Sequence, residues 1–245
     1  MSFNTKALRD NLWYRKTPTG DDDGASMSDD QTRLKAVPAG SKRRRAIEQR
    51  RADMRRAALH FFSRFGLHGT SLDQVAERAG VSKTNLIYHY PTKEALYTAV
   101  LGDMLELWIA PFQALRPDVE AQPAIRHYIR LKLELSRDHA EASRLFCLEM
   151  VQGAPHLSDM LEGNLRALVD DKAWVIEQWV ERGDIAPTDA RHLFYLLWAT
   201  TQHYADFAIQ IEAISGKTLA DPTFLETAIG NLQTTIMDGL TPRHP

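Results

Sequence analysis

The pattern of apolar and polar positions is helical along most of the chain, and it is clearest between residues 70 and 93. Two short amphipathic segments there are separated by Gly80, and each follows a serine, Ser71 or Ser82, that can cap a helix. Gly80 can adopt the left-handed conformation that ends a helix. The pattern therefore predicts a helix-turn-helix whose second helix begins at Lys83. The apolar positions of the two helices together are Leu72, Val75, Ala76, Ala79, Leu86 and Ile87.

Longer amphipathic segments lie on either side of this motif. One helix is predicted from about residue 42 to Gly66, and Thr92 predicts the cap of a long helix over residues 93–115. Because Pro111 has no amide hydrogen to donate to the carbonyl of Leu107, we expect a kink there. The remaining predicted helices cover residues 123–138, 140–152, 157–182, 189–211 after a Thr188 cap, and 221–239.

No segment alternates convincingly as a strand, so the predicted fold class is all-α. We expect an N-terminal three-helix DNA-binding domain with the helix-turn-helix over residues 41–91. A helical ligand-binding and dimerisation domain should follow over residues 92–245. Residues 1–40 have few periodic apolar positions and equal numbers of acidic and basic side chains, which predicts a disordered N-terminal extension.

Composition excludes several classes of protein. The single cysteine, Cys147, excludes a disulfide framework and a CxxC metal site, and its apolar neighbours predict a buried thiol. The nine histidines form no HExxH motif, and the chain has no glycine-rich phosphate loop, so neither an enzyme nor a metal site is expected. No apolar run approaches 18 residues, and the chain does not begin with a signal-peptide core. We therefore expect a cytoplasmic protein with no membrane partner.

The net charge of −2 conceals an uneven distribution. Residues 42–90 carry 11 Lys and Arg against 4 Asp and Glu, whereas residues 91–245 carry 13 against 22. The basic segment is the one that contains the helix-turn-helix, which favours binding to the phosphates of double-stranded DNA. An all-α adaptor that binds another protein is the alternative class, but it would not explain this coincidence.

The second helix of the motif presents groups that can reach bases and phosphates. We expect its first residues, Lys83, Thr84 and Asn85, to contact base edges, and Tyr88, His89 and Lys93 to hold phosphates. The basic start of the preceding helix should add phosphate contacts. The full set of predicted DNA-binding residues is Arg44, Arg45, Thr70, Ser82, Lys83, Thr84, Asn85, Tyr88, His89 and Lys93.

A different chemistry is suggested by the helix predicted over residues 189–211. Tyr195, Trp198, Gln202 and Asp206 fall on one face of it, so an amide and an aromatic ring share an interior surface. A buried glutamine is costly unless both its NH₂ and its C=O have partners, which a ligand with an adjacent N–H and carbonyl could supply. The alternative from the residues alone is that Trp198 is core and Gln202 bonds a neighbouring backbone group.

Two motifs resemble a known family. They are G-x-x-x-T-S-L-x-Q-V-A from Gly66 and A-G-V-S-K-T-N-L-I-Y-H-Y-P-T-K-E-A-L from Ala79, preceded by an amphipathic helix. Together these resemble the DNA-binding domain of the TetR family of transcriptional regulators over about 60 residues. The chain departs from the family pattern at Thr84, where glycine is usual, and at Ile87, where a phosphate-contacting tyrosine is frequent.

The likeness extends further to the branch of that family that represses pyrimidine-utilisation genes. It is carried by L-W-I-A-P-F from Leu107, A-S-R-L-F-C-L-E-M from Ala142 and W-A-T-T-Q-H-Y-A-D-F from Trp198. This resemblance implies a homodimeric repressor, without a cofactor, that uracil or thymine releases from its operator. A repressor of the same type for a different hydrophobic small molecule is the alternative. The implied ligand-binding residues are Trp108, Ile109, Leu145, Phe146, Trp198, Gln202 and Tyr204.

Overall fold

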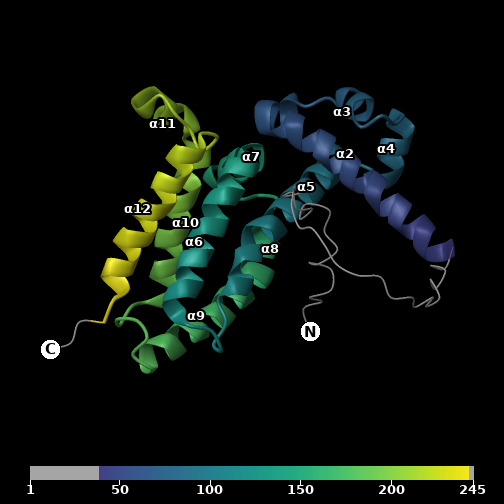
Figure 1. Cartoon of the computed structure of the whole chain (residues 1–245). Helices are drawn as coiled ribbons and strands as arrows, with labels where there is room; N and C mark the ends of the chain where they lie inside the picture. The colour runs from purple at the N-terminus through teal and green to yellow at the C-terminus, as the bar shows by residue number, and fades with distance from the viewer. Residues whose placement is uncertain (1–38, 243–245) are drawn as a thin grey trace, which may run out of the picture. The chain divides into compact units, whose positions relative to one another are not determined.

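The computed structural model describes the backbone of residues 39–242 and the side chains of residues 42–242. The predicted extension over residues 1–40 lies outside the described residues except for its last two, which are helical. Residues 39–242 contain helices and no strand, which confirms the all-α fold class (Figure 1). The chain divides into a unit that ends at Glu48 and a compact unit from Gln49 onward.

The predicted helix-turn-helix is present with the expected boundaries. Helix α3 spans Leu72–Arg78 and helix α4 spans Lys83–His89. The hydroxyl of Ser71 accepts a hydrogen bond from the amide of Asp73, and the hydroxyl of Ser82 accepts one from the amide of Asn85. Gly80 between the helices has φ of 66°, a conformation that costs glycine little because it has no Cβ. The local caps therefore fix both helix starts, as the sequence predicted.

Helix α2, Ala39–Gly69, precedes this motif. Its backbone leaves the helical conformation at Gly66, with φ of 65° and ψ of −176°, and a short helical piece continues to Gly69. The predicted end at Gly66 is thus the position of a break rather than the last helical residue. Met54 and Phe62 are fully buried on its inner face, whereas Phe65 is 57% exposed.

Helix α5, Lys93–Ile109, begins as predicted, because Thr92 Oγ1 accepts a hydrogen bond from the amide of Ala95. It does not continue to residue 115. A 3₁₀ segment, η2 (Ala110–Ala114), replaces it with Pro111 in the first turn, where the missing amide costs no hydrogen bond. The predicted kink is therefore a change of helix type.

Residues 93–114 together are long and apolar enough to cross a membrane by length and composition alone, with a mean hydropathy of 1.2. Half of the most apolar stretch is buried inside the protein. Leu96 and Leu101 on α5 are fully buried, so the apolar side chains of this helix pack in the hydrophobic core.

The rest of the described chain contains eight further helical elements, and three details differ from the prediction. The expected single helix over residues 157–182 contains a π-helical turn, η3. Asp189 rather than Thr188 caps α10, since its carboxylate accepts from the amide of His192. The helix expected to run to residue 211 breaks at Phe207. The elements are α6 Ala121–Asp138, α7 Ala140–Val151, α8 Ser158–Met160, η3 Leu161–Leu165, α9 Arg166–Glu181, α10 Ala190–Asp206, α11 Ala208–Ser215 and α12 Pro222–Leu240.

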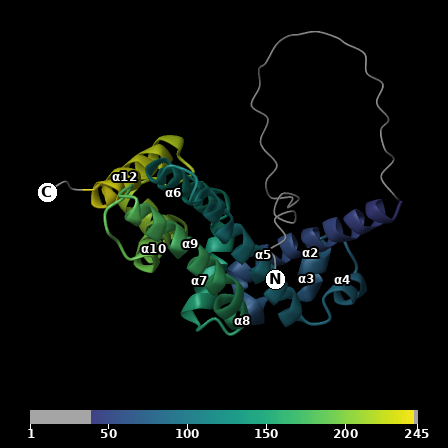
Figure 2. The ribbon, with the colours of Figure 1, turned by 90° about the horizontal axis from the view of Figure 1, so that it is seen from below.

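The helices form two hydrophobic cores within the unit that begins at Gln49. One joins α2, α3, α4 and the first part of α5 with α7, and the other joins α6, α9, α10 and α12 with η2. Helix α6 lies beside both α10 and α12 in the two views of Figures 1 and 2. Because α5 contributes to the first core and its last residue, Ile109, packs on the second, it connects the two predicted domains.

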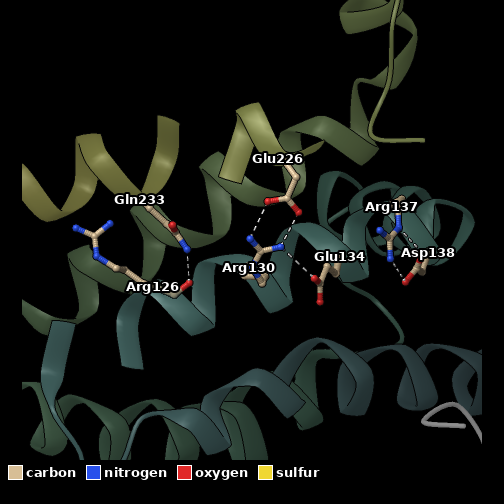
Figure 3. Close-up of polar contacts among 7 residues, drawn as sticks. All are labelled: Arg126, Arg130, Glu134, Arg137, Asp138, Glu226 and Gln233. Atoms are coloured by element: carbon tan, nitrogen blue, oxygen red, sulfur yellow. Dashed lines mark hydrogen bonds and ion pairs between the residues drawn. The ribbon is translucent and has the colours of Figure 1, made fainter. Parts of the chain in front are cut away.

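Polar side chains at the surface connect α6 and α12 (Figure 3). The guanidinium of Arg130 donates two parallel hydrogen bonds to the carboxylate of Glu226, at 2.7 and 2.8 Å, and also lies 3.5 Å from Glu134. Arg126 lies one turn before Arg130 on α6, and its backbone carbonyl accepts a hydrogen bond from Gln233 Nε2 of α12 at 2.9 Å. These contacts fix the register of the two helices above their apolar interface.

Candidate DNA-binding and effector-binding sites

The outer face of α4 carries the side chains that the sequence assigned to DNA. Ser82, Lys83 and Thr84 are exposed, and Tyr88 is 82% exposed. Lys83 Nζ forms an ion pair with Asp73 Oδ2 on α3 at 2.9 Å, so its charge is shared before any DNA is bound. The exposed hydroxyls of Thr84 and Tyr88 are therefore the most accessible polar groups for a nucleic acid on this helix.

Two other residues of α4 are less exposed than expected. Asn85 is half-buried, and its Oδ1 is buried without a hydrogen-bond partner among the described residues. His89 is half-buried as well, with its ring edge-on to that of Tyr88 at 5.2 Å between centroids. That Asn85 reads a base edge stays a prediction, and it would require this side chain to rotate outward.

Thr70 and Lys93 are engaged with the protein itself. The hydroxyl of Thr70, which is 4% exposed, donates to the carbonyl of Gly66 at 2.7 Å. Lys93 Nζ donates to the carbonyls of His68 and Thr70, at 3.2 and 3.1 Å. Both residues therefore stabilise the turn between α2 and α3, because they satisfy carbonyls at the end of a helix. A phosphate contact by Lys93 stays a prediction and would use its remaining N–H.

Arg44 and Arg45 are exposed in the first turns of α2. They belong to the unit that ends at Glu48. Their phosphate contacts stay a prediction.

The unit from Gln49 contains an apolar cavity of about 230 Å³. Five of the seven predicted ligand-binding residues line it, namely Trp108, Ile109, Phe146, Trp198 and Gln202. Helices α5, α7 and α10 therefore converge on this cavity, and ligand binding by these residues stays a prediction. The other lining residues are Leu105, Phe112, Lys132, Met150, Leu161 and Leu165.

Leu145 and Tyr204, also predicted to line the pocket, do not line this cavity. Leu145 is fully buried in the core shared by α2, α5 and α7, on a different side of α7 from Phe146. The ring of Tyr204 packs edge-on against Phe224 of α12 at 6.2 Å. Both residues belong to helices that line the cavity, but their positions around the helix axis turn them toward other neighbours.

The polar groups of the cavity have few partners of their own. Gln202 has no side-chain hydrogen bond within the described residues. Trp108 is 4% exposed, and its indole N–H is buried without an acceptor. The indole N–H of Trp198, in contrast, donates to the hydroxyl of Tyr128 at 2.9 Å, and its ring stacks on Phe194. Trp198 is therefore held rigidly, whereas Gln202 and Trp108 retain unused hydrogen-bonding capacity.

Sequence reasoning missed one member of the site, Lys132 on α6. It is 1% exposed, lines the cavity and holds its ammonium 4.7 Å from the centre of the Trp108 ring. Burial lowers the pKa of Lys132 from 10.5 to about 7, and the carboxylate of Asp206 opposes part of that change. Its position was readable, because Lys132 follows the buried Tyr128 and Ile129 by four and three residues and so continues their stripe.

Asp206 and Cys147 lie beside this group. Burial raises the pKa of the Asp206 carboxyl, while hydrogen bonds from Ser143 and Cys147 act against that rise. Cys147 is half-buried rather than fully buried, and burial raises the pKa of its thiol. Within residues 42–242, no group of three His, Cys, Asp or Glu side chains is placed to hold a metal ion.

A helix-turn-helix, followed by a helical bundle that encloses a small cavity, defines a ligand-responsive DNA-binding regulator. The family model for bacterial regulatory proteins of the tetR family matches residues 55–100, and the model for the C-terminal region of YcdC-like proteins matches residues 101–243. The chain belongs to the TetR family of bacterial transcriptional regulators. Members of this family bind DNA operators and small-molecule effectors, act as dimers and are not enzymes.

Within the family, the chain is 53% identical over 208 residues to the HTH-type transcriptional regulator RutR of Escherichia coli strain K12. The alignment covers 85% of this chain and 98% of that protein. Solved structures agree on the fold. The ketosteroid transcriptional regulator KstR2 of Mycobacterium tuberculosis gives a TM-score of 0.61 at 17% identity, covering 79% of this chain and 96% of that one. A TetR family regulator from Marinobacter aquaeolei VT8 gives 0.60 at 17% identity, covering 82% and 100%.

Proposed function

We propose that this regulator represses pyrimidine-utilisation genes and is released from its operator by uracil or thymine. The observation that carries the proposal is the cavity between Trp108 and Trp198, where the amide of Gln202 has no partner within the described residues. A primary amide can pair with the adjacent N–H and carbonyl of a uracil ring, and an indole offers a flat surface for stacking. The 53% identity to RutR over nearly its whole length supports the same assignment.

The size of the cavity also favours a small effector. Its volume of about 230 Å³ is below the ~300–1,000 Å³ of pockets that take drug-sized ligands. The alternative is a TetR-type repressor for a different hydrophobic small molecule, and the mainly apolar lining supports it. A long acyl chain or a sterol, however, would have to enlarge the cavity and would leave Gln202 without a partner.

Release from DNA requires that the effector bind one conformation of the protein better than another. Helix α5 suits this coupling, since Trp108 lies at the cavity and Lys93, about 22 Å away at 1.5 Å per residue, holds the turn before α3. Filling the cavity would fix α5 at a tilt that moves the two recognition helices of the dimer away from one-turn spacing. Operator affinity would then fall about 5- to 150-fold. The proposed regulator acts in the cytoplasm.

Calorimetric titration with uracil, thymine, cytosine and a fatty acyl-CoA tests this assignment. Uracil or thymine should bind most tightly, and Gln202→Ala should lose roughly 1–3 kcal/mol of uracil binding because two polar edges of the ligand become unpaired. The variant should still bind operator but no longer respond to uracil. Gln210→Ala, at an exposed glutamine on α11, is the matched control and should behave as wild type. Tightest binding of the acyl-CoA, or normal uracil release by Gln202→Ala, would contradict the proposal.

A further inference from the structure

Among the described residues that line the cavity, Lys132 is the one charged side chain, and no hydrogen bond compensates for its burial. It is 1% exposed and makes no hydrogen bond within the described residues. Its ammonium lies over the ring of Trp108, which compensates only part of the lost hydration. A buried ammonium with three N–H groups and no acceptor is a site prepared for an acceptor from outside the chain.

Three side chains around the cavity have hydrogen-bonding groups without partners among the described residues, and because the exposed lining is apolar, these groups would have to turn toward a ligand to meet it. Lys132 supplies three N–H donors, the indole of Trp108 supplies another, and the amide of Gln202 supplies two donors and one acceptor. Donors therefore outnumber acceptors around this cavity. A ligand that satisfies these protein groups must therefore offer at least two hydrogen-bond acceptors, with a single strong donor placed between the two acceptors. A cyclic imide, with an N–H flanked by two carbonyls, has that arrangement.

We infer that Lys132 is a specificity-determining residue that binds the second carbonyl of the effector and so restricts the site to cyclic imides. The inference rests on the proposed function. In that proposal Gln202 binds one N–H and the adjacent carbonyl of the ring, and here Lys132 binds the carbonyl on the other side of the ring. A ring that carries an amino group in place of that carbonyl, such as cytosine, would turn N–H groups toward a cation. A ring with hydrogen at that position would leave the ammonium unpaired. Both are rejected, because a site built to hydrogen-bond a ligand discriminates strongly against analogues that lack the group.

The electrostatic surroundings of Lys132 agree with this role. Asp206 on α10 is the charged group that acts on it, and that carboxylate is itself bonded by Ser143 and Cys147 of α7. Lys132 thus has a counter-charge nearby but no direct partner, which leaves its N–H groups for a ligand. The carbonyl of an imide accepts such a charge-assisted hydrogen bond without any covalent step.

The experiment compares uracil with 2-hydroxypyrimidine, which lacks the second carbonyl, and with glutarimide, which keeps the imide but not the aromatic ring. Wild-type protein should prefer uracil to 2-hydroxypyrimidine by at least about tenfold and should bind glutarimide measurably in calorimetry. Lys132→Met should weaken uracil binding about 10- to 100-fold, the usual loss for a charge-assisted hydrogen bond. It should also reduce the preference for uracil over 2-hydroxypyrimidine, which a purely structural role would leave unchanged.

Two further variants separate the possible outcomes. Lys132→Gln keeps a donor without the charge and should retain more of the uracil preference than Lys132→Met. It also preserves the test if the methionine variant does not fold. Lys172→Met, at a lysine outside the cavity lining, should change neither affinity. An unchanged uracil preference in Lys132→Met and Lys132→Gln would overturn this inference while leaving the proposed function intact. Failure of the wild-type protein to bind uracil or thymine would instead overturn the proposed function.

Discussion

Lys132 should reduce the stability of the folded protein. A buried charge without a hydrogen-bond acceptor among the described residues is costly, and replacing it with an apolar side chain of similar length should stabilise the fold by about 1–4 kcal/mol. Without effector, Lys132→Met should therefore unfold at a higher temperature than the wild-type protein in calorimetry at pH 7. An equal or lower unfolding temperature would mean that the lysine contributes to folding in a way that its contacts do not indicate.

The stability difference should also depend on pH in a defined direction. The native pKa of Lys132 is about 7 and its ordinary value is 10.5, so between these values the unfolded chain binds more protons than the native protein. Wild-type stability should consequently rise with pH over this interval as far as this group is concerned. The advantage of Lys132→Met should be largest at and below pH 7 and should shrink toward pH 10. The difference in unfolding free energy between the two proteins, measured in urea at several pH values, checks this window.

On the recognition helix α4, we expect some residues to contact phosphates and others to contact base edges. Tyr88→Phe removes an exposed phenolic hydroxyl and should weaken binding to operator and to unrelated duplexes by the same factor. Thr84→Ala should alter the preference among operator sequences, because an exposed hydroxyl and methyl in the first turn of the helix can reach base edges. Fluorescence anisotropy with operator and scrambled duplexes measures both, and the opposite assignment would follow if Tyr88→Phe changed preference while Thr84→Ala did not.

The candidate site was predictable to the extent that a side chain could be assigned to a face of a helix. Trp198 and Gln202 were found because an amide beside an aromatic ring is uncommon on an apolar face, and Trp108 through the family resemblance. Lys132 was not found, since a lysine in an amphipathic helix is usually taken for a surface residue. Leu145 was predicted to line the cavity and does not, because helix α7 buries two faces and the sequence does not tell which of them borders the cavity.

Among the helices, the boundaries marked by local chemistry were predicted and the others were not. Ser71, Ser82 and Thr92 each cap a helix through their own hydroxyl, within three residues of the amide that they bind. The break at Phe207 and the π-helical turn η3 have no comparable local signal. Packing against neighbouring helices decides such interruptions, and that information is distributed over distant parts of the chain.

A buried hydrogen-bond cluster should hold α5 to α7. Glu149, which is fully buried, accepts from the hydroxyl of Tyr97 at 3.0 Å and from the amide of His156 at 2.7 Å. Tyr97→Phe keeps the ring but removes one donor from a buried carboxylate, which should cost about 1–3 kcal/mol of unfolding free energy in urea denaturation. Tyr88→Phe is the matched control, and its exposed hydroxyl should contribute nothing measurable. If the two variants are equally stable, the hydrogen bond between Tyr97 and Glu149 does not stabilise the packing of α5 on α7.

For the molecule as a whole, the surface of α10 bears on assembly. Tyr195, Leu196 and Phe207 are about half exposed along α10 and at its end. By resemblance to the family, we expect the dimer interface on the last two long helices, α10 and α12, and an isologous contact there would separate two recognition helices by about 34–36 Å, one turn of DNA.

Leu196→Glu should therefore convert the dimer to a monomer in light scattering at micromolar concentration. It should also lose high-affinity operator binding while retaining uracil binding, because the cavity lining comes from one chain. Glu212→Ala on α11 is a control outside α10 and should remain dimeric. A dimeric Leu196→Glu, or a wild-type protein that is monomeric under these conditions, would place the interface elsewhere or exclude it.

The π-helical turn η3 has a consequence for how the cavity exchanges its contents with solvent. Leu161 and Leu165, the first and last residues of η3, both line the cavity, and the π-helical turn between them interrupts the regular α-helical hydrogen bonding. Local opening should therefore be cheapest in this part of the wall. Backbone amides of residues 161–165 should take up deuterium faster than those of α10, and uracil should slow that uptake. Uptake that is unaffected by uracil would indicate that the ligand enters through another side of the bundle.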